Sequence, residues 1–199
     1  MFDVTLIREP APHRGPAFPA ANETPAIRRR PAPRRKKGPL AKVTDFNALL
    51  RLLTENQVAF IIVGGAAATA HGSARLTLNL DVVYERSREN TARIVNALVP
   101  IQPYFRSAPP GLPFDWSVET IEKGLNFTLI TKLGALDLSG EVVGGGGYQQ
   151  LFSETIKVEI DGVECLCLNL PQLIEVKRAA GRPKDREVIA ELEQIRDET

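Results

Sequence analysis

The chain has 199 residues, which is room for one ordinary domain or one domain with a tail. Hydrophobic residues make up 43% and charged residues 25%, and no apolar run approaches the roughly 20 residues of a transmembrane helix, so the sequence excludes an integral membrane protein. Two cysteines cannot form a disulfide framework, and the first ten residues lack the apolar core of a secretory signal. We therefore expect a cytoplasmic protein with no membrane partner.

The formal net charge of +1 is unevenly distributed along the chain. Residues 1–40 contain nine Arg or Lys, three Asp or Glu and eight of the fifteen prolines. Because proline removes backbone donors and few large apolar residues are present, we expect residues 1–40 to be a disordered, basic tail and residues 41–199 to fold. The basic run at 28–37 has two interpretations: an arm for RNA, DNA or an acidic partner, or a solvated tail without such a role.

The remaining sequence mixes helical and strand patterns. Asp45 is placed to cap a helix over 46–56, and a β-branched apolar run at 58–63 predicts a buried strand that ends at two glycines. The elements that follow are a short helix over 66–71, a strand over 78–84, a helix over 89–98, a proline- and aromatic-rich loop over 100–117, strands over 126–131 and 135–143, a flexible glycine loop over 144–147, strands over 156–160 and 163–168, and helices over 170–180 and 184–196. This order predicts an α/β (α+β) domain with a mixed central sheet flanked by helices.

The segment from Gly64 to Asp81 contains the pattern most indicative of function. Gly64-Gly65 brings backbone close to any ligand, and the helix that follows directs free N–H groups to the same place, which suits phosphate. Asn79 and Asp81 alternate on a strand, so their side chains share one face and could hold Mg²⁺. Asp137 stands alone in an otherwise apolar strand and could supply a further carboxylate.

This pattern resembles the signature of the nucleotidyltransferase superfamily with the polymerase-beta-like fold. It is most similar to small bacterial nucleotidyltransferase-like proteins related to abortive-infection type E toxins and to minimal nucleotidyltransferases. The segment 173–185 is similar to the closing part of the same family pattern, so the resemblance spans about residues 43–196. The matching residues of the first segment are Gly64, Gly65, Ala67, His71, Gly72, Arg75, Thr77, Leu80 and Asp81.

The resemblance implies a role for each matching polar residue. Asp81 and Asp137 would be the carboxylates that hold Mg²⁺ or Mn²⁺, and Asp137 could also act as general base. Asn79 stands where the family has its first metal-binding aspartate, and its neutral carbonyl would be a weakened third ligand. The nucleotide-binding residues would be Gly64, Gly65, Arg75, Thr77, Lys177, Arg182 and Asp185.

Each of these roles has a structural alternative. Asp81 could be a strand-end charge paired with Arg75, and Asp137 could pair with a neighbouring Arg or Lys. Lys177, Arg182 and Asp185 could form a structural ion-pair network. We expect His71 to cap its helix or bond the backbone, and Cys165 and Cys167 to be core residues rather than a zinc site.

The sequence thus leaves two functions open. The first is an enzyme that transfers a nucleotidyl group from an NTP to a hydroxyl of RNA (for example tRNA), protein or a small molecule. Its relatives suggest a toxin with a cognate antitoxin as partner. The second is a catalytically degenerate protein of the same fold that binds a nucleotide or a partner without turnover, which Asn79 favours.

Overall fold

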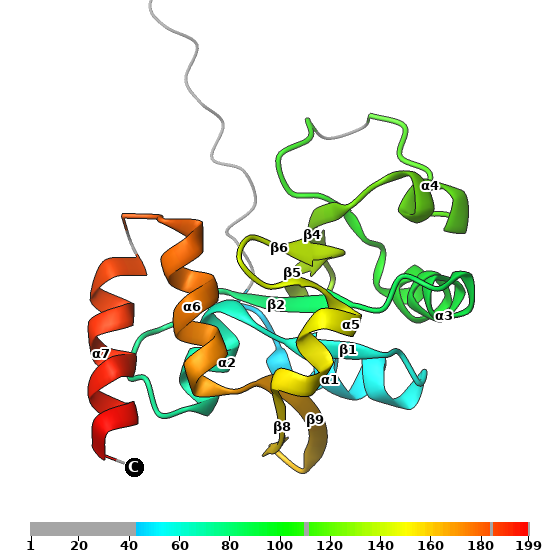
Figure 1. The fold of residues 1–199 in the computed structure, drawn as a ribbon. Coiled ribbons are helices and arrows are strands. Elements are labelled where there is room, and N and C mark those ends of the chain that lie inside the picture. The colour runs from blue at the N-terminus through cyan, green and yellow to red at the C-terminus, as the bar shows by residue number, and fades with distance from the viewer. Residues whose placement is uncertain (1–42, 110–111, 184, 199) are drawn as a thin grey trace, which may run out of the picture. The chain divides into compact units, whose positions relative to one another are not determined.

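The computed structural model describes residues 43–109, 112–183 and 185–198. The predicted tail at 1–40 and its basic run lie outside these residues. The described chain forms a mixed seven-stranded sheet in the order β3-β4-β5-β2-β1-β9-β8, with a separate two-stranded β6-β7 sheet (Figure 1). The predicted mixed α/β class with a central sheet and flanking helices is confirmed.

The strands and helices follow one another from a first helix to two closing helices. The strands are β1 (Phe60–Ile62), β2 (Asn79–Tyr84), β3 (Tyr104–Phe105), β4 (Asn126–Thr131), β5 (Gly134–Ser139), β6 (Glu141–Val142), β7 (Gly146–Gly147), β8 (Thr155–Ile160) and β9 (Val163–Leu168). The α-helices are α1 (Phe46–Glu55), α2 (Gly64–Ala70), α3 (Arg88–Leu98), α4 (Val118–Lys123), α5 (Tyr148–Leu151), α6 (Leu170–Ala180) and α7 (Asp185–Glu198). Two 3₁₀ turns are η1 (Val99–Ile101) and η2 (Phe152–Glu154).

The four central strands of the sheet form both parallel and antiparallel pairs. β2 runs parallel to β5 and antiparallel to β1, and β1 runs parallel to β9. The register of β2 on β5 places Asp81 directly opposite Asp137. The hydroxyl of Thr44 donates to Leu78 O and accepts from Ala135 N, so it ties together the starts of both strands.

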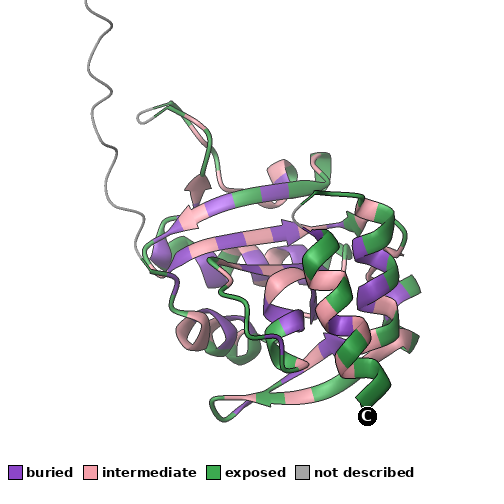
Figure 2. Ribbon diagram, turned by 90° about the vertical axis from the view of Figure 1, so that its left-hand side faces the viewer, coloured by how far each residue is buried: buried purple, intermediate pink, exposed green. Residues whose placement is uncertain are grey.

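The side chains of β2 divide between the core and a more open face. Leu80 and Val82 are fully buried, whereas Asn79 and Asp81 are half-buried. Figure 2 shows the same alternation of buried and intermediate residues along the central strands. Because alternate strand residues point to opposite faces, the apolar residues of β2 join the core while its polar pair faces a partly open space.

Two groups of helices pack on the strands. Helix α1 contacts β2, β9 and α3, and it buries Leu49, Leu50 and Leu53. Asp45 caps α1 as predicted, because its side chain accepts from the Ala48 N–H. Helix α2 contacts β2, β9 and α6, and α6 packs against α7 (Figure 1). The second group therefore brings the C-terminal helices close to the polar residues of β2.

The run Gly144–Gly147 differs from its prediction as a flexible loop. Gly146 and Gly147 form β7, which pairs with β6. A Cβ at Gly144 would lie 2.3 Å from the Cβ of Ala179, and one at Gly145 would lie 3.0 Å from Val176 Cγ2. Close packing on α6 thus explains Gly144 and Gly145, and the prediction of a loop was wrong for Gly146 and Gly147, which are a strand.

Other boundaries also differ from the sequence prediction. The strand expected over 135–143 is divided into β5 and β6 at Gly140. The loop expected over 100–117 overlaps the end of η1 and contains the edge strand β3, and α4 and α5 were not predicted. The short helix begins at Gly64 rather than at 66, and the strand before it is limited to 60–62. Among the helices of the described residues, none has both the length and the apolar character required to cross a membrane.

Candidate functional site

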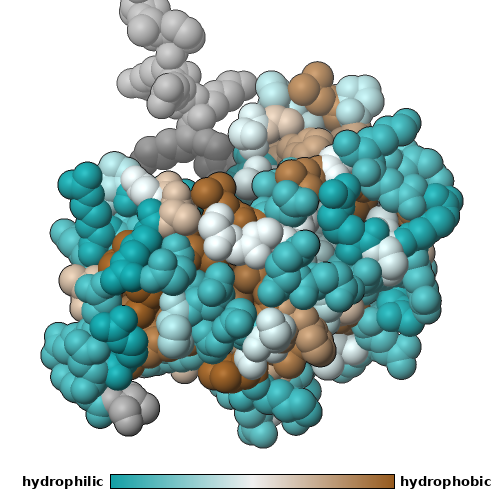
Figure 3. Space-filling model, viewed as in Figure 1, coloured by the Kyte–Doolittle hydropathy of each residue, from teal (hydrophilic) through white to brown (hydrophobic). Residues whose placement is uncertain are grey.

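One cavity gathers all ten residues that the sequence analysis selected as catalytic, metal-binding or nucleotide-binding. Its volume is about 710 Å³, and it lies among β2, β5, the start of α2 and the helices α6 and α7. The face that carries α6 and α7 is largely hydrophilic, with apolar side chains exposed in smaller patches (Figure 3). The ten residues are Gly64, Gly65, Arg75, Thr77, Asn79, Asp81, Asp137, Lys177, Arg182 and Asp185.

The two glycines allow polar side chains of the neighbouring segment to approach the first turn of α2. A Cβ at Gly64 would lie 2.5 Å from Asp81 Oδ2, and a Cβ at Gly65 would lie 2.5 Å from Thr77 Oγ1. Gly64 also has φ +65°, a backbone conformation that residues other than glycine rarely adopt. The Gly65 N–H points at Asp81 Oδ2 across 3.5 Å. The pair of glycines, Thr77 and Asp81 therefore form one packed unit.

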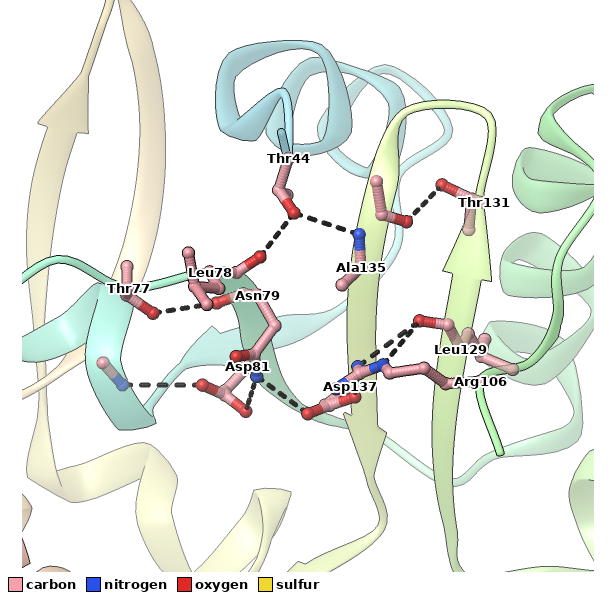
Figure 4. A network of polar contacts seen from close by, with 12 residues as sticks. Thr44, Thr77, Leu78, Asn79, Asp81, Arg106, Leu129, Thr131, Ala135 and Asp137 are labelled. Carbon is pink, nitrogen blue, oxygen red and sulfur yellow. Dashed lines mark hydrogen bonds and ion pairs between the residues drawn. The ribbon is translucent and has the colours of Figure 1, made fainter. Parts of the chain in front are cut away.

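The amide of Asn79 joins the two carboxylates. Its Nδ2 donates to Asp81 Oδ1 at 2.7 Å and to Asp137 Oδ2 at 2.8 Å (Figure 4). Asn79 and Asp81 share one face of β2, and the parallel register brings Asp137 alongside. Both carboxylates therefore converge on one point, which the amide nitrogen occupies.

Arg106 adds a charge that the sequence analysis did not select. Its guanidinium forms an ion pair with Asp137 Oδ1, and its Nε and Nη2 donate to Leu129 O at 3.4 and 3.3 Å (Figure 4). Asp137 thus has the Arg partner that its structural alternative anticipated. Arg106 lies directly after β3, and the sheet order β3-β4-β5 places it across β4 from Asp137. No sequence spacing indicates this contact, because it depends on how the edge strand pairs.

A buried ion pair lies where α6 meets α7. Lys177 Nζ and Asp185 Oδ1 are 3.5 Å apart, and only 9% and 10% of their side chains are exposed. Both residues also line the cavity, as does the exposed Arg182. A buried charge needs a partner, and Lys177 and Asp185 form one pair of the structural ion-pair network that the sequence analysis gave as the alternative. Both groups nevertheless lie at the cavity wall.

Arg75 joins the segment before β2 to α7. Its Nη1 donates to Glu187 at 2.9 Å and its Nε to Glu191 at 3.0 Å, and these carboxylates raise the pKa of Arg75. Glu191 also accepts from the Ala74 N–H at 2.9 Å, which is the main cause that lowers the pKa of Glu191. Arg75 therefore holds the segment before β2 in position, and this segment places Thr77 next to Gly65.

His71 and the cysteines have the structural roles expected of them. His71 Nε2 lies 2.7 Å from Leu168 O and links the end of α2 to β9. Cys165 and Cys167 are buried, and burial raises the pKa of Cys167 to about 12. The trapped thiols are thus core residues.

The donor set at the junction of β2 and β5 fits one divalent cation. Asp81 and Asp137 already converge on a single donor, and rotation of the Asn79 amide would present its carbonyl oxygen. Within residues 43–109, 112–183 and 185–198 there is no group of three or more His, Cys, Asp or Glu side chains suited to a metal. With two carboxylates and a neutral amide, the site offers less negative charge than three carboxylates would.

Together, the fold and cavity define a mixed α/β protein with a polar cleft at the centre of its sheet. No protein-family model and no curated protein matches the chain. Among solved structures, the chain is similar to a putative nucleotidyltransferase (TM1012) from Thermotoga maritima, with 15% sequence identity and a TM-score of 0.48. The match covers 73% of this chain and 88% of the Thermotoga chain. This similarity is too low to assign the chain to a family.

Proposed function

We propose that the cavity binds an NTP and that the chain is a nucleotidyltransferase-like protein, which transfers the nucleotidyl group of the NTP to a hydroxyl and releases pyrophosphate, with Mg²⁺ or Mn²⁺ as cofactor. One observation supports this proposal most strongly. The ten residues selected as catalytic, metal-binding or nucleotide-binding are spread from Gly64 to Asp185, yet all ten line a single cavity. Such convergence would be unexpected if the signature had arisen from unrelated structural needs.

The chain's own residues can be given roles in this reaction. Asp81 and Asp137 would hold the cation, and Asp137 could accept the proton of the attacking hydroxyl. The bound cation would supply charge to screen the triphosphate and to ease deprotonation of the acceptor. Gly64 and Gly65 would allow phosphate to approach the backbone closely, and Lys177 and Arg182 would add positively charged groups to the cavity lining.

The second candidate is a binding protein of the same fold that holds a nucleotide or partner without turnover. The observation in its favour is the Asn79 amide, which bridges Asp81 and Asp137 through hydrogen bonds of 2.7 and 2.8 Å. A neutral donor at this point satisfies both carboxylates without a metal. It also removes one of the charges that would attract a divalent cation.

Label transfer from each α-labelled NTP to total tRNA and to the protein itself would separate these candidates. We would compare the wild type, Asn79→Asp and Asp81→Ala in Mg²⁺ or Mn²⁺, and measure NTP binding in parallel. Transfer by the wild type that is lost in Asp81→Ala supports the enzyme. Binding by the wild type with transfer only by Asn79→Asp supports the binding protein. Absence of NTP binding to all three proteins contradicts the enzyme and the nucleotide-binding form of the second candidate.

A toxin of a toxin–antitoxin pair is the cellular form of the first candidate. It rests on the resemblance to toxin-related nucleotidyltransferases, and a cognate antitoxin would be its partner. Induced expression in a bacterial host should then arrest growth. Asp81→Ala, expressed to the same level, should permit growth. Normal growth after induction of the wild type would contradict the toxin role and leave the cavity assignment intact.

A further inference from the structure

Arg106 places a permanent positive charge inside the cleft. Its guanidinium pairs with Asp137 Oδ1, and 38% of the Arg106 side chain is exposed against 19% of Asp137. Both residues line the same cavity. The other oxygen of Asp137 accepts from the Asn79 amide at 2.8 Å. Each oxygen of this carboxylate therefore has a donor within the protein.

A divalent cation and Arg106 would compete for the same carboxylate. A metal needs oxygen lone pairs of Asp137, and the guanidinium Nη2 already donates to one of those on Oδ1. Two positive charges that close together also repel each other strongly in a partly buried site. The ion pair seen here and a metal bound to Asp137 are thus alternative states of the cleft.

Arg106 differs from two other cations of the cavity wall in the identity of its partner. Arg75 is held by carboxylates of α7, and Lys177 is held by the buried Asp185. The partner of Arg106 is itself a proposed cation ligand. A cation that takes Asp137 would therefore release the charge of Arg106 into the cavity, where a guanidinium can bind phosphate oxygens in a bidentate manner.

We propose that Arg106 is an exchangeable counter-ion: it occupies Asp137 in the resting cleft, gives way to a divalent cation, and then binds the phosphates of the nucleotide. This inference rests on the proposed function, since it takes Asp137 as a cation ligand and an NTP as the anion. It makes binding of metal and nucleotide mutually supportive, because the metal frees the residue that the phosphates require. It also explains how one of the two carboxylates, Asp137, has its charge balanced without metal.

Titration with Mn²⁺ alone, followed by the electron paramagnetic resonance signal of the free ion, tests the first half of the proposal. Arg106→Gln should bind Mn²⁺ at least about tenfold more tightly than the wild type, because the substitution removes a positive charge that repels the divalent ion even when solvent screens it. Arg106→Lys, which keeps the positive charge but lacks the paired N–H donors of a guanidinium, should have a Mn²⁺ affinity between those of the wild type and Arg106→Gln. Arg88→Gln, which removes an equal charge that is paired with Glu119 and Glu122 and does not line the cavity, should change Mn²⁺ binding by less than about threefold.

Binding of a fluorescent ATP analogue (mant-ATP) in saturating Mn²⁺ tests the second half. Arg106→Gln should weaken this binding by about fivefold or more, the reverse of its effect on the metal. Equal Mn²⁺ affinity for the wild type and Arg106→Gln would overturn the competition. Unchanged mant-ATP affinity in Arg106→Gln would overturn the transfer to phosphate. If the wild type binds no mant-ATP, the proposed function fails, while the Mn²⁺ titration still decides whether Arg106 competes with the metal for Asp137.

Discussion

Asp81 Oδ2 lies 2.5 Å from the position that a Cβ would take at Gly64, so residue 64 can have no side chain while Asp81 keeps its place. Gly64 also has φ +65°. Gly64→Ala should therefore lower the free energy of unfolding by about 1–3 kcal/mol, through backbone strain and through displacement of Asp81. Urea denaturation would measure the loss of stability, and Mn²⁺ titration would report the displaced carboxylate.

Gly72 provides a matched control for this substitution. It has φ +99°, yet a Cβ there would meet no atom within 4 Å. Gly72→Ala should show the strain alone, about 1 kcal/mol, and should leave Mn²⁺ binding unchanged. Equal losses of stability and of Mn²⁺ affinity in the two variants would contradict a specific contact between Gly64 and Asp81.

Asn79→Asp tests how far the amide bridge replaces a metal. The substitution removes a donor to Asp81 and Asp137 and places a third carboxylate within about 3 Å of both. Without metal, repulsion should lower the free energy of unfolding by about 1–3 kcal/mol. Added Mn²⁺ should raise the melting temperature of the variant more than that of the wild type, because the ion binds the native state more tightly.

Asn79→Ala separates the lost bridge from the added charge. It removes both hydrogen bonds and introduces no third carboxylate, so it should destabilise the metal-free protein less than Asn79→Asp does. Thermal unfolding in EDTA and in Mn²⁺ would compare the three proteins. A metal-free Asn79→Asp that is as stable as the wild type would show that Asp81 and Asp137 are not close enough in solution to repel a third charge.

The sequence was sufficient to predict the pairing of polar groups at the centre of the sheet. The two-residue spacing of Asn79 and Asp81 fixes a common face once the segment is a strand. A lone Asp137 in an apolar strand is costly unless a partner lies beside it. The parallel pairing of β2 with β5 then brings them together, as expected for the candidate site.

The contact of Arg106 could not be predicted in this way. Arg106 reaches Asp137 across β4 because the two-residue strand β3 pairs at the edge of the sheet. So short a strand has no periodicity for a sequence to reveal. The role of Gly144 and Gly145 was missed for a related reason: glycine indicates either conformational freedom or close packing, and here only the position of α6 decides between them.

Glu191 fastens the segment before β2 to helix α7, and its removal should loosen that segment. Glu191 accepts from the Ala74 N–H and from Arg75. Glu191→Ala should accelerate hydrogen exchange of the Ala74 amide and weaken binding in the cavity, because Thr77 follows in the same segment. Glu187→Ala removes only a bond to Arg75, so it should leave exchange at Ala74 nearly unchanged. Equal exchange rates in the two variants would contradict this role.

The same contact should depend on pH in a defined direction. The Ala74 N–H holds the pKa of Glu191 below its usual value, so the charged carboxylate is favoured in the native state. The stabilisation is therefore present above the ordinary glutamate pKa of about 4.3 and is lost as pH falls through the lowered value. Protection of the Ala74 amide, corrected for intrinsic exchange, should decrease in acid. A protection factor that does not change with acidification before the protein unfolds would contradict the bond.

Burial protects the two cysteines from reaction in the native protein. It raises the pKa of Cys167 to about 12 and also raises that of Cys165. At about pH 8 the native chain should therefore resist iodoacetamide, whereas the chain in concentrated guanidinium chloride should be modified at both thiols. Mass spectrometry would follow the reaction, and Cys165→Ala would assign the slower site. Cys165 lines a second cavity and Cys167 does not, so Cys165 should react first.

Alkaline pH should lower stability for the same reason. An unfolded thiol loses its proton near pH 8.5, while Cys167 in the native state keeps its proton to about pH 12. Between these values the unfolded chain binds fewer protons, so the free energy of unfolding falls as pH rises. Cys167→Ala should be less stable near neutral pH, because it leaves a cavity, but should lose less stability between about pH 8 and 10. Parallel losses in the two proteins over that range would mean that Cys167 ionises as readily in the native state as in the unfolded one.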